Sequence, residues 1–409
     1  MPKIEKVSAR EIIDSRGKPT IETKITLDDN TSGIASLPSG ASTGKYEALE
    51  LRDEDGKGVT KAIANVNTII AKTIIGKEFN QKTLDDELLK LDGTPNKSRL
   101  GANAILSVSL AFARASAESE NQPLYKYFGG LCKNSSFKMP VPMMNILNGG
   151  RHAQNSTDFQ EFMIVPVGAS TFRETMARCE KTIEALKIVL EDRGLSTKLG
   201  DEGGFAPELR ANETAVQILI EAIRKAGFSE GKEIATSIDV AASELKNDGG
   251  YQLKHENRTL TKSELLALYE SWTSRYPIIS IEDPFSEDEW DAFQELTQKI
   301  GNKVQIVGDD LFATNKKRLE EGIWRKAANA IIIKPNQAGT VSETIETATM
   351  AKRAGFRLVV SHRSGETEDS SIADLAVGLG AEWVKFGATT QKERMVKYSR
   401  LLQIETGLK

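Results

Sequence analysis

The sequence predicts an α/β protein in which a C-terminal (β/α)8-type barrel follows a smaller N-terminal α+β domain. One observation is a change of pattern near residue 138, where Pro140 and the pair Gly149-Gly150 interrupt the chain. A second is the series of six short apolar runs, separated by amphipathic segments, that follows this point. The third is that each run ends on a titratable residue, namely Asp239, Glu282, Asp309, Lys334, His362 and Lys385. We therefore expect domains at residues 1–138 and 139–409.

The N-terminal domain begins with a strand pattern and continues with helical patterns. Apolar or small side chains alternate with polar ones from Ile21 to Leu27, as in a strand with one buried face. Asp28-Asp29-Asn30 follows as a turn. Residues 59–74 carry apolar side chains at helical spacing, and residues 100–117 have the composition of a second, longer helix. This mixture predicts an α+β domain.

The six apolar runs predict the strands of the barrel. Their endpoints are 43, 27, 25, 28 and 23 residues apart, about the length of one βα unit with its loops. Runs this apolar are typical of parallel strands covered by helices, and a succession of them favours a barrel over an open sheet. The carboxyl ends of barrel strands meet at one mouth, where active sites lie. A single Asp at a strand end is usually a cap or turn residue, but six titratable residues in phase indicate a site.

Three of these strand ends predict a metal site. Asp239, Glu282 and Asp309 should converge at the mouth, where bare carboxylates repel one another unless a cation lies among them. Oxygen ligands without cysteine favour Mg²⁺ or Mn²⁺ over zinc. The structural alternative is a set of salt bridges to Lys334 and Lys385. Two lysines in the same mouth indicate chemistry on an anion, and a metal with a second ammonium would lower the pKa of Lys334 so that it acts as a base.

The composition excludes several classes of protein. With 39% apolar and 27% charged residues and a net charge of −4, the chain is typical of a soluble globular protein and offers no basic stripe for nucleic acid. No run of 18 apolar residues predicts a transmembrane segment, and the first residues lack the apolar core of a signal peptide. Cys132 and Cys179 lack metal-ligand or CxxC spacing, so we expect a reduced, cytoplasmic protein.

Three loop segments also carry polar residues. GASTGK resembles a phosphate loop, but its first glycine is one residue too close and Tyr46 replaces the Ser or Thr that would hold Mg²⁺, so no nucleotide site is expected. GDEGGFAP presents Glu202 on a tight loop. The segment after Gly149-Gly150 carries His152, Gln160 and Glu161.

Together these segments resemble the enolase family along essentially the whole chain. The matching stretches are DSRGKPTIE, PSGASTG, EALELRD, NKSRLGANAIL, PVPMMNILNGG, QEFMIVP, GDEGGFAP, DVAASE, SIEDPF, VGDDLFATN, SHRSGETED and KYSRLLQIE. The resemblance implies an N-terminal α+β domain and a barrel of the order ββαα(βα)6, which begins with two antiparallel strands and two helices. That division agrees with the one expected near residue 138.

The resemblance also implies an activity, the dehydration of 2-phospho-D-glycerate to phosphoenolpyruvate. Lys334 would take the proton from C2, and two Mg²⁺ ions with Lys385 would hold the resulting negative charge. Glu202, helped by Glu161 and with His152 nearby, would protonate the departing C3 hydroxyl. The implied metal ligands are Asp239, Glu282 and Asp309, with Ser42 joining the second metal. The implied substrate-binding residues are Ser42, His152, Gln160, Glu161, Lys334, His362, Arg363, Ser364 and Lys385, of which Arg363 and Ser364 would hold the phosphate.

A few positions depart from the family pattern. They are Arg151, Pro335, Ala338, Gln391, Lys392 and Gln403. An arginine usual at position 403 belongs to charge pairing between subunits, so the change bears on whether the expected homo-oligomer is a dimer or an octamer. The substitutions around Lys334 and at Arg151 motivate an alternative, a relative that acts on another phosphorylated or phosphonate acid. A non-catalytic homologue is a further alternative, which the intact set of charged residues opposes.

Overall fold

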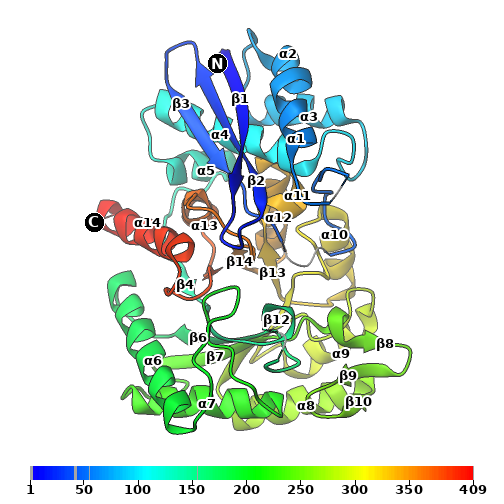
Figure 1. The fold of residues 1–409 in the computed structure, drawn as a ribbon, viewed down its shortest axis with the longest axis vertical. Helices are drawn as coiled ribbons and strands as arrows, with labels where there is room; N and C mark the ends of the chain where they lie inside the picture. The colour runs from blue at the N-terminus through cyan, green and yellow to red at the C-terminus, as the bar shows by residue number, and fades with distance from the viewer. Residues whose placement is uncertain (1–2, 41–43, 55, 154, 409) are drawn as a thin grey trace.

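The structure is a computed structural model that describes residues 3–40, 44–54, 56–153 and 155–408. It shows an N-terminal α+β domain, coloured blue to cyan in Figure 1, that packs on a C-terminal β/α barrel. The predicted fold class is thereby confirmed, while the boundary expected at residue 138 stays a prediction. No described helix combines the length and the apolar character that crossing a lipid bilayer requires.

A three-stranded antiparallel sheet and a group of helices form the N-terminal domain. The strands, in the order β1-β2-β3, are β1 (Ile4–Ile13), β2 (Pro19–Leu27) and β3 (Ser32–Ser36). The helices are α1 (Thr60–Ala64), α2 (Ala71–Ile74), α3 (Gln81–Asp92), α4 (Ala102–Ser119) and α5 (Leu124–Cys132). The alternation predicted for β2 is confirmed, because Ile21, Thr23, Ile25 and Leu27 are fully buried. Helix α4 packs against β2 and β3 and covers this face.

The helix predicted over residues 59–74 is present but not uniform. A π-helical segment, Asn65–Ile70, separates α1 from α2. Val66, Ile70 and Ile74 are spaced by four residues and are all fully buried. In an α-helix of 3.6 residues per turn, side chains four residues apart point in slightly different directions. A π turn contains more residues, so it keeps these three side chains on the same buried face.

The barrel is a single sheet that closes through one stretch of chain. Its strand order is β4-β15-β14-β13-β12-β11-β7-β6-β5. The strands are β4 (Val141–Pro142), β5 (Met144–Asn148), β6 (Glu161–Pro166), β7 (Ile234–Asp239), β11 (Ile278–Glu282), β12 (Gln305–Gly308), β13 (Ala330–Ile333), β14 (Arg357–Ser361) and β15 (Trp383–Lys385). Only Met143 separates β4 from β5, so the two edges of the sheet come from one continuous segment.

Helices follow the strands in the expected order. After β5 and β6 come two helices, and β7, β11, β12, β13, β14 and β15 are then each followed by at least one. These helices are α6 (Phe172–Asp192), α7 (Asn212–Lys225), α8 (Lys262–Arg275), α9 (Trp290–Ile300), α10 (Lys316–Arg325), α11 (Pro335–Ala338), α12 (Val341–Arg353), α13 (Ser371–Leu379) and α14 (Lys392–Leu408). A small hairpin sheet of β8 (Lys246–Asn247), β9 (Gly250–Leu253) and β10 (Arg258–Leu260) precedes α8. This is the order ββαα(βα)6.

The N-terminal domain binds the barrel through the first turn of α12. The backbone N–H of Ser342 donates to Asp85 Oδ2 over 2.8 Å, and that of Val341 donates to Ser109 Oγ over 3.0 Å. A carboxylate at a helix N-terminus is favourable, because it satisfies backbone donors that have no partner inside the helix. Asp85 is fully buried, so this contact carries an ionisable group into the domain interface.

Asp85 leads to a prediction about stability and pH. Burial raises the pKa of Asp85 from 3.8 to about 6, so ionisation favours the unfolded chain. The resulting loss of folding free energy is absent below the unfolded-state pKa of 3.8 and grows as the pH rises from 3.8 to about 6. Above both values it amounts to about 3 kcal/mol. We expect the melting temperature of Asp85→Asn to rise relative to wild type between pH 4 and pH 7. Thermal unfolding at several pH values measures this, with Asp86→Asn on the exposed side of α3 as control; a difference that does not vary with pH contradicts the prediction.

Candidate active site

The alternation of side chains along the strands brings polar residues into the barrel mouth. Ala330 and Ile332 of β13 belong to the apolar layer inside the barrel, so Lys334 lies on the same face one step further along. Trp383 of β15 belongs to that layer as well, and Lys385 follows it at the same spacing. The lysines therefore project inward above an apolar layer, as the strand-end pattern predicts.

Strand β6 delivers its functional residue from its first position. It runs antiparallel to both neighbours, so its amino end lies at the mouth. Glu161 is the first residue of β6 and is paired in register with Asp239 of β7 and Asn148 of β5. Met163 and Val165 continue the same face into the apolar layer. The pattern of strand carboxyl ends alone does not predict this position.

A polar pocket at the mouth brings most of the predicted residues together. Its lining consists of Glu47, His152, Gln160, Glu161, Glu202, Asp239, Ala241, Glu244, Asp283, Asp309, Asp310, Lys334, Ser361, His362, Arg363, Ser364 and Lys385. Glu282 is fully buried and reaches the cluster through its contact with Lys385. Ser42, which the resemblance assigns to the second metal, lies outside the described residues.

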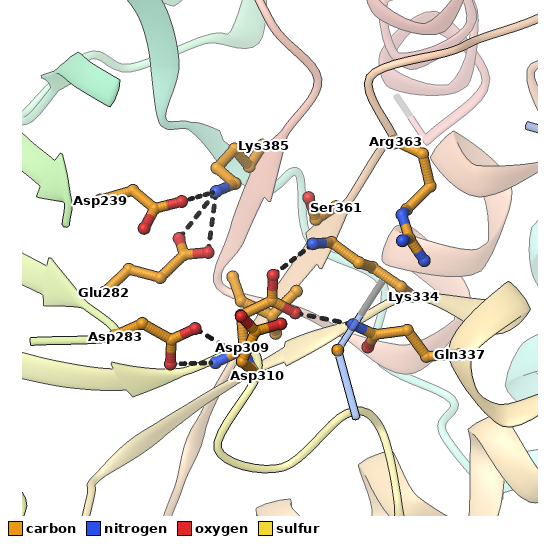
Figure 2. Close-up of polar contacts among 12 residues, drawn as sticks. Asp239, Glu282, Asp283, Asp309, Asp310, Lys334, Gln337, Ser361, Arg363 and Lys385 are labelled. Atoms are coloured by element: carbon orange, nitrogen blue, oxygen red, sulfur yellow. Dashed lines mark hydrogen bonds and ion pairs between the residues drawn. The ribbon is translucent and has the colours of Figure 1, made fainter. Parts of the chain in front are cut away.

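Lys385 is the centre of a buried ion cluster (Figure 2). Its Nζ lies 3.0 Å from Asp239 Oδ2, 2.8 Å from Glu282 Oε1 and 3.2 Å from Glu161 Oε2. Burial lowers the pKa of Lys385, but the three carboxylates outweigh burial and hold that pKa well above its usual value. Burial and the repulsion of Asp239 raise the pKa of Glu282 well above its usual value. One ammonium thus faces three carboxylates, which is too little positive charge for all of them.

Lys334 pairs with Asp309, and this contact raises its pKa. Its Nζ donates to Asp309 Oδ2, while Gln337 Nε2 donates to Asp309 Oδ1 over 3.0 Å. Burial lowers the pKa of Lys334, but the contact with Asp309 outweighs it, so the pKa is raised. The lowering expected from a metal and a second ammonium together stays a prediction, because in this arrangement the Asp309 charge acts on the lysine directly. Lys385 and Arg363 act in the predicted direction, as their positive charges lower the pKa of Lys334.

The carboxylates of the pocket fit a divalent cation. Asp283 accepts the backbone N–H groups of Asp309 and Asp310, over 2.9 and 2.7 Å. Burial and neighbouring carboxylates raise the pKa of Asp283 well above its usual value and that of Asp310 to about 8. The salt bridges to Lys334 and Lys385, which the sequence offered as the alternative to a metal site, are present. The carboxylates that line the pocket nevertheless outnumber its cations Lys334, Lys385 and Arg363. Buried oxygen ligands with excess negative charge are the donor set that Mg²⁺ prefers.

His152, Glu161 and Glu202 form an acid–base group in the same pocket. His152 lies between two carboxylates, with Nδ1 3.6 Å from Glu161 Oε1 and Nε2 3.6 Å from Glu202 Oε1. Burial and repulsion by Glu202 raise the pKa of Glu161 well above its usual value. Burial also raises the pKa of Glu202, but His152 and His362 outweigh it and hold that pKa well below its usual value. Within this pair of carboxyls, a proton therefore favours Glu161.

The loop after β14 provides a third cation. The Arg363 guanidinium donates to both oxygens of Glu47, over 2.8 and 3.2 Å, and to Asn336 Oδ1 over 3.1 Å. Ser364 Oγ lies 3.4 Å from a guanidinium nitrogen of Arg16 in the N-terminal domain. A fork-like guanidinium that already holds a carboxylate in bidentate fashion has the geometry to hold a phosphate.

Glu47, Asn145 and Arg394 are site residues that the sequence did not single out. Glu47 is separated from Arg363 by more than three hundred residues, and Asn145 Nδ2 donates to Glu202 Oε2 over 3.0 Å from β5. Arg394 lies on α14 and is completely buried. Glu47 falls within EALELRD and Asn145 within PVPMMNILNGG, so the quoted motifs contained a signal for these two. Arg394 directly follows GATTQKE, a stretch that departs from the family pattern, so the sequence contained no signal for this residue.

The loop that carries Glu202 depends on glycine. Gly203 has φ +83, and a Cβ there would lie 2.4 Å from Thr390 Oγ1. The turn therefore requires a residue without a side chain, as the prediction of a tight loop in GDEGGFAP implies. The backbone N–H of Ala388 donates to the Glu202 carbonyl over 3.0 Å, which ties this loop to the end of the barrel.

Positions that depart from the family pattern have defined contacts in the structure. Pro335 is the first residue of α11, where its fixed φ suits a helix start, and this helix carries Gln337 onto Asp309. Arg151 pairs with Glu244 over 2.7 Å at the rim of the pocket. Gln403 Oε1 accepts from Arg400 over 3.4 Å within α14.

An acid–base cluster at the mouth of a barrel that an α+β domain contacts indicates a β/α-barrel enzyme. Comparison with protein families agrees with this assignment over both domains. Residues 4–128 match the model of the enolase N-terminal domain, and residues 136–409 match the model of the enolase C-terminal TIM-barrel domain. The chain belongs to the enolase family.

Proposed function

We propose that this protein catalyses the reversible, Mg²⁺-dependent dehydration of 2-phospho-D-glycerate to phosphoenolpyruvate, a step of glycolysis and gluconeogenesis. The observation that carries the proposal is that Lys334, Lys385 and the Glu161–Glu202 pair line one buried pocket. Such a reaction needs a base at C2 and an acid at the C3 hydroxyl, on opposite sides of one small anion. The cations of the pocket suit a substrate with carboxylate and phosphate groups.

Lys334 is the proposed base. It accepts the C2 proton, and Lys385 stabilises the negative charge that develops towards the substrate carboxylate. When bound, Mg²⁺ supplies further positive charge for that end of the substrate, with Asp239, Glu282 and Asp309 as its proposed ligands. The contact with Asp309 holds the pKa of Lys334 above its usual value, whereas the positive charges of Lys385 and Arg363 act in the direction that a base requires. Mg²⁺ bound at Asp309 would add to the effect of these two charges.

Glu202 is the proposed acid, with Glu161 as the group that supplies its proton. The departing C3 hydroxyl takes a proton from Glu202 and leaves as water. His152 lies between the two carboxyls and provides a route for the proton from Glu161, whose pKa is raised, to Glu202. Because both carboxyls are buried, water does not compete for this proton.

Arg363 and Ser364 are the proposed phosphate-binding residues, and His362 and Gln160 complete the substrate pocket. The contact between Arg363 and Glu47 supports this role, because it shows that an anion fits against the guanidinium. Two Mg²⁺ ions per site, with Ser42 as a ligand of the second, a homodimer or octamer as the assembly, and a cytoplasmic location are further parts of the proposal.

Arg151 favours a second candidate, a related phosphorylated or phosphonate acid as substrate. Its guanidinium adds a positive charge at the rim of the pocket, next to Glu244, which also lines the pocket. A substrate with an additional anionic group would pair with Arg151 in place of Glu244.

A direct assay distinguishes these candidates. Purified protein with Mg²⁺ and 2-phosphoglycerate should produce ultraviolet absorbance from the enol product, and EDTA should abolish it. Restoring excess Mg²⁺ should return the rate, which separates metal removal from denaturation. Absence of signal at high enzyme concentration overturns the first candidate and favours the second.

A further inference from the structure

Arg394 connects α14 to two loops of the active site. It is completely buried, and its NH1 nitrogen donates to the carbonyl of Arg363 over 2.7 Å. Its NH2 nitrogen donates to the carbonyl of Ser364 over 2.7 Å and to that of Asp201 over 3.3 Å. One guanidinium thus holds the phosphate-binding segment and the loop of Glu202 in a fixed relation.

A further contact of Arg394 determines where His362 carries its proton. NH1 lies 2.7 Å from His362 Nδ1. An arginine side chain is always charged and only donates, so Nδ1 must be the accepting nitrogen of the ring. The proton of the neutral imidazole therefore lies on Nε2, which is 3.2 Å from Glu202 Oε2. Burial lowers the pKa of His362 to about 4, in agreement with a neutral ring beside a cation.

The two oxygens of Glu202 then have different surroundings. Oε2 accepts a hydrogen bond from Nδ2 of Asn145 over 3.0 Å and also lies 3.2 Å from Nε2 of His362, the ring nitrogen that carries the proton. A proton on Oε2 would point at these donors and displace one of them. Oε1 faces His152 at 3.6 Å and lacks such a pair of donors among the described contacts. The protonated form of Glu202 therefore carries its proton on Oε1.

We propose that Arg394 is a positioning residue for the elimination step: it fixes His362 as the Nε2–H tautomer and thereby makes Oε1 the oxygen of Glu202 that delivers the proton. In that step the C3–O bond breaks, the Glu202 Oε1 proton joins the leaving hydroxyl to form water, and the electron pair left at C2 forms the C2=C3 bond. Glu202 becomes a carboxylate, and His362 and Arg394 remain unchanged. The elimination rests on the proposed function, whereas the tautomer does not.

The tautomer is tested first in the wild-type protein. The chain contains three histidines, so [15N]histidine labelling gives a simple spectrum, and His362→Gln assigns the signals of His362. Long-range proton–nitrogen spectra without substrate should show a protonated Nε2 and an unprotonated Nδ1. A protonated Nδ1 in wild type overturns the proposal without the need for any variant.

The role in elimination is tested with Arg394→Met. We expect the rate of dehydration to fall about 100-fold, the size of a general-acid contribution, while release of deuterium from C2 of labelled 2-phosphoglycerate changes less than about threefold. The His362 signals should also shift away from the pure Nε2–H form. Arg394→Lys keeps a cation and should recover part of the elimination rate; equal losses of exchange and elimination in both variants overturn the proposal.

Arg400→Met is the matched control. Arg400 lies on the same helix and forms a bidentate pair with Asp374, away from the loops of the site. Arg400→Met should leave the His362 tautomer and the ratio of elimination to exchange unchanged. If wild type releases no deuterium and forms no product, the proposed function fails, whereas a tautomer that depends on Arg394 still supports the positioning of His362.

Discussion

Lys334→Ala should lower dehydration by about 10⁴-fold and should also abolish release of deuterium from C2 of the substrate. The upper range for a general base is about 10⁴, and no other amine of the described pocket reaches this position without leaving its carboxylates. The base acts in the first chemical step, so its loss removes both exchange and elimination. Stopped-flow absorbance and loss of label from C2 measure the two effects separately.

The same variant should bind Mg²⁺ more tightly than wild type does. Lys334 donates to Asp309, and its removal leaves a buried carboxylate without its ammonium partner. A divalent cation then meets less competition at Asp309, so added Mg²⁺ should raise the melting temperature by more than it does in wild type.

Lys334→Arg is the matched control for these two effects. Arginine keeps the positive charge beside Asp309 but does not lose its proton in a protein. It should therefore be as inactive as the alanine variant while its response to Mg²⁺ stays close to that of wild type. Substantial activity in either variant refutes the assignment of Lys334 as the base.

The sequence predicted the barrel well because each strand is a local pattern. Runs such as Ala330–Ile333 are apolar, short and followed by a polar residue, and the alternation along a strand then determines which side chains face inward. Lys334 and Lys385 needed no further information to be placed in the mouth. The carboxylates proposed as metal ligands followed in the same way, from residues at the ends of parallel strands.

Other parts of the site depend on contacts between distant segments, and local patterns do not contain them. Glu161 reaches the mouth only because β6 runs against its neighbours. Glu47 and Arg394 meet Arg363 from the N-terminal domain and from α14. The raised pKa of Lys334 depends on its direct contact with Asp309, and the sequence gives the presence of Asp309 but not this contact.

Lys385→Met should reduce both activity and stability, and Mg²⁺ should restore only the second. Lys385 lies within 3.2 Å of Asp239, Glu282 and Glu161, and all three carboxylates are almost fully buried. Removing one partner of a buried ion cluster costs about 3–5 kcal/mol, because the remaining charges lose their compensation. We expect a large loss of melting temperature in EDTA and a rise on addition of Mg²⁺ that exceeds the rise in wild type.

The activity of Lys385→Met should stay low in saturating Mg²⁺, by about 10²–10³-fold, the effect of removing one donor that stabilises charge in a transition state. Metal restores neutrality among the carboxylates, but the ammonium that faces the substrate is still missing. Lys385→Arg keeps the charge with a different shape, so it should recover stability in EDTA and only part of the rate. A melting temperature in EDTA equal to that of wild type would show that these carboxylates are protonated rather than paired, and would remove Lys385 from the centre of the cluster.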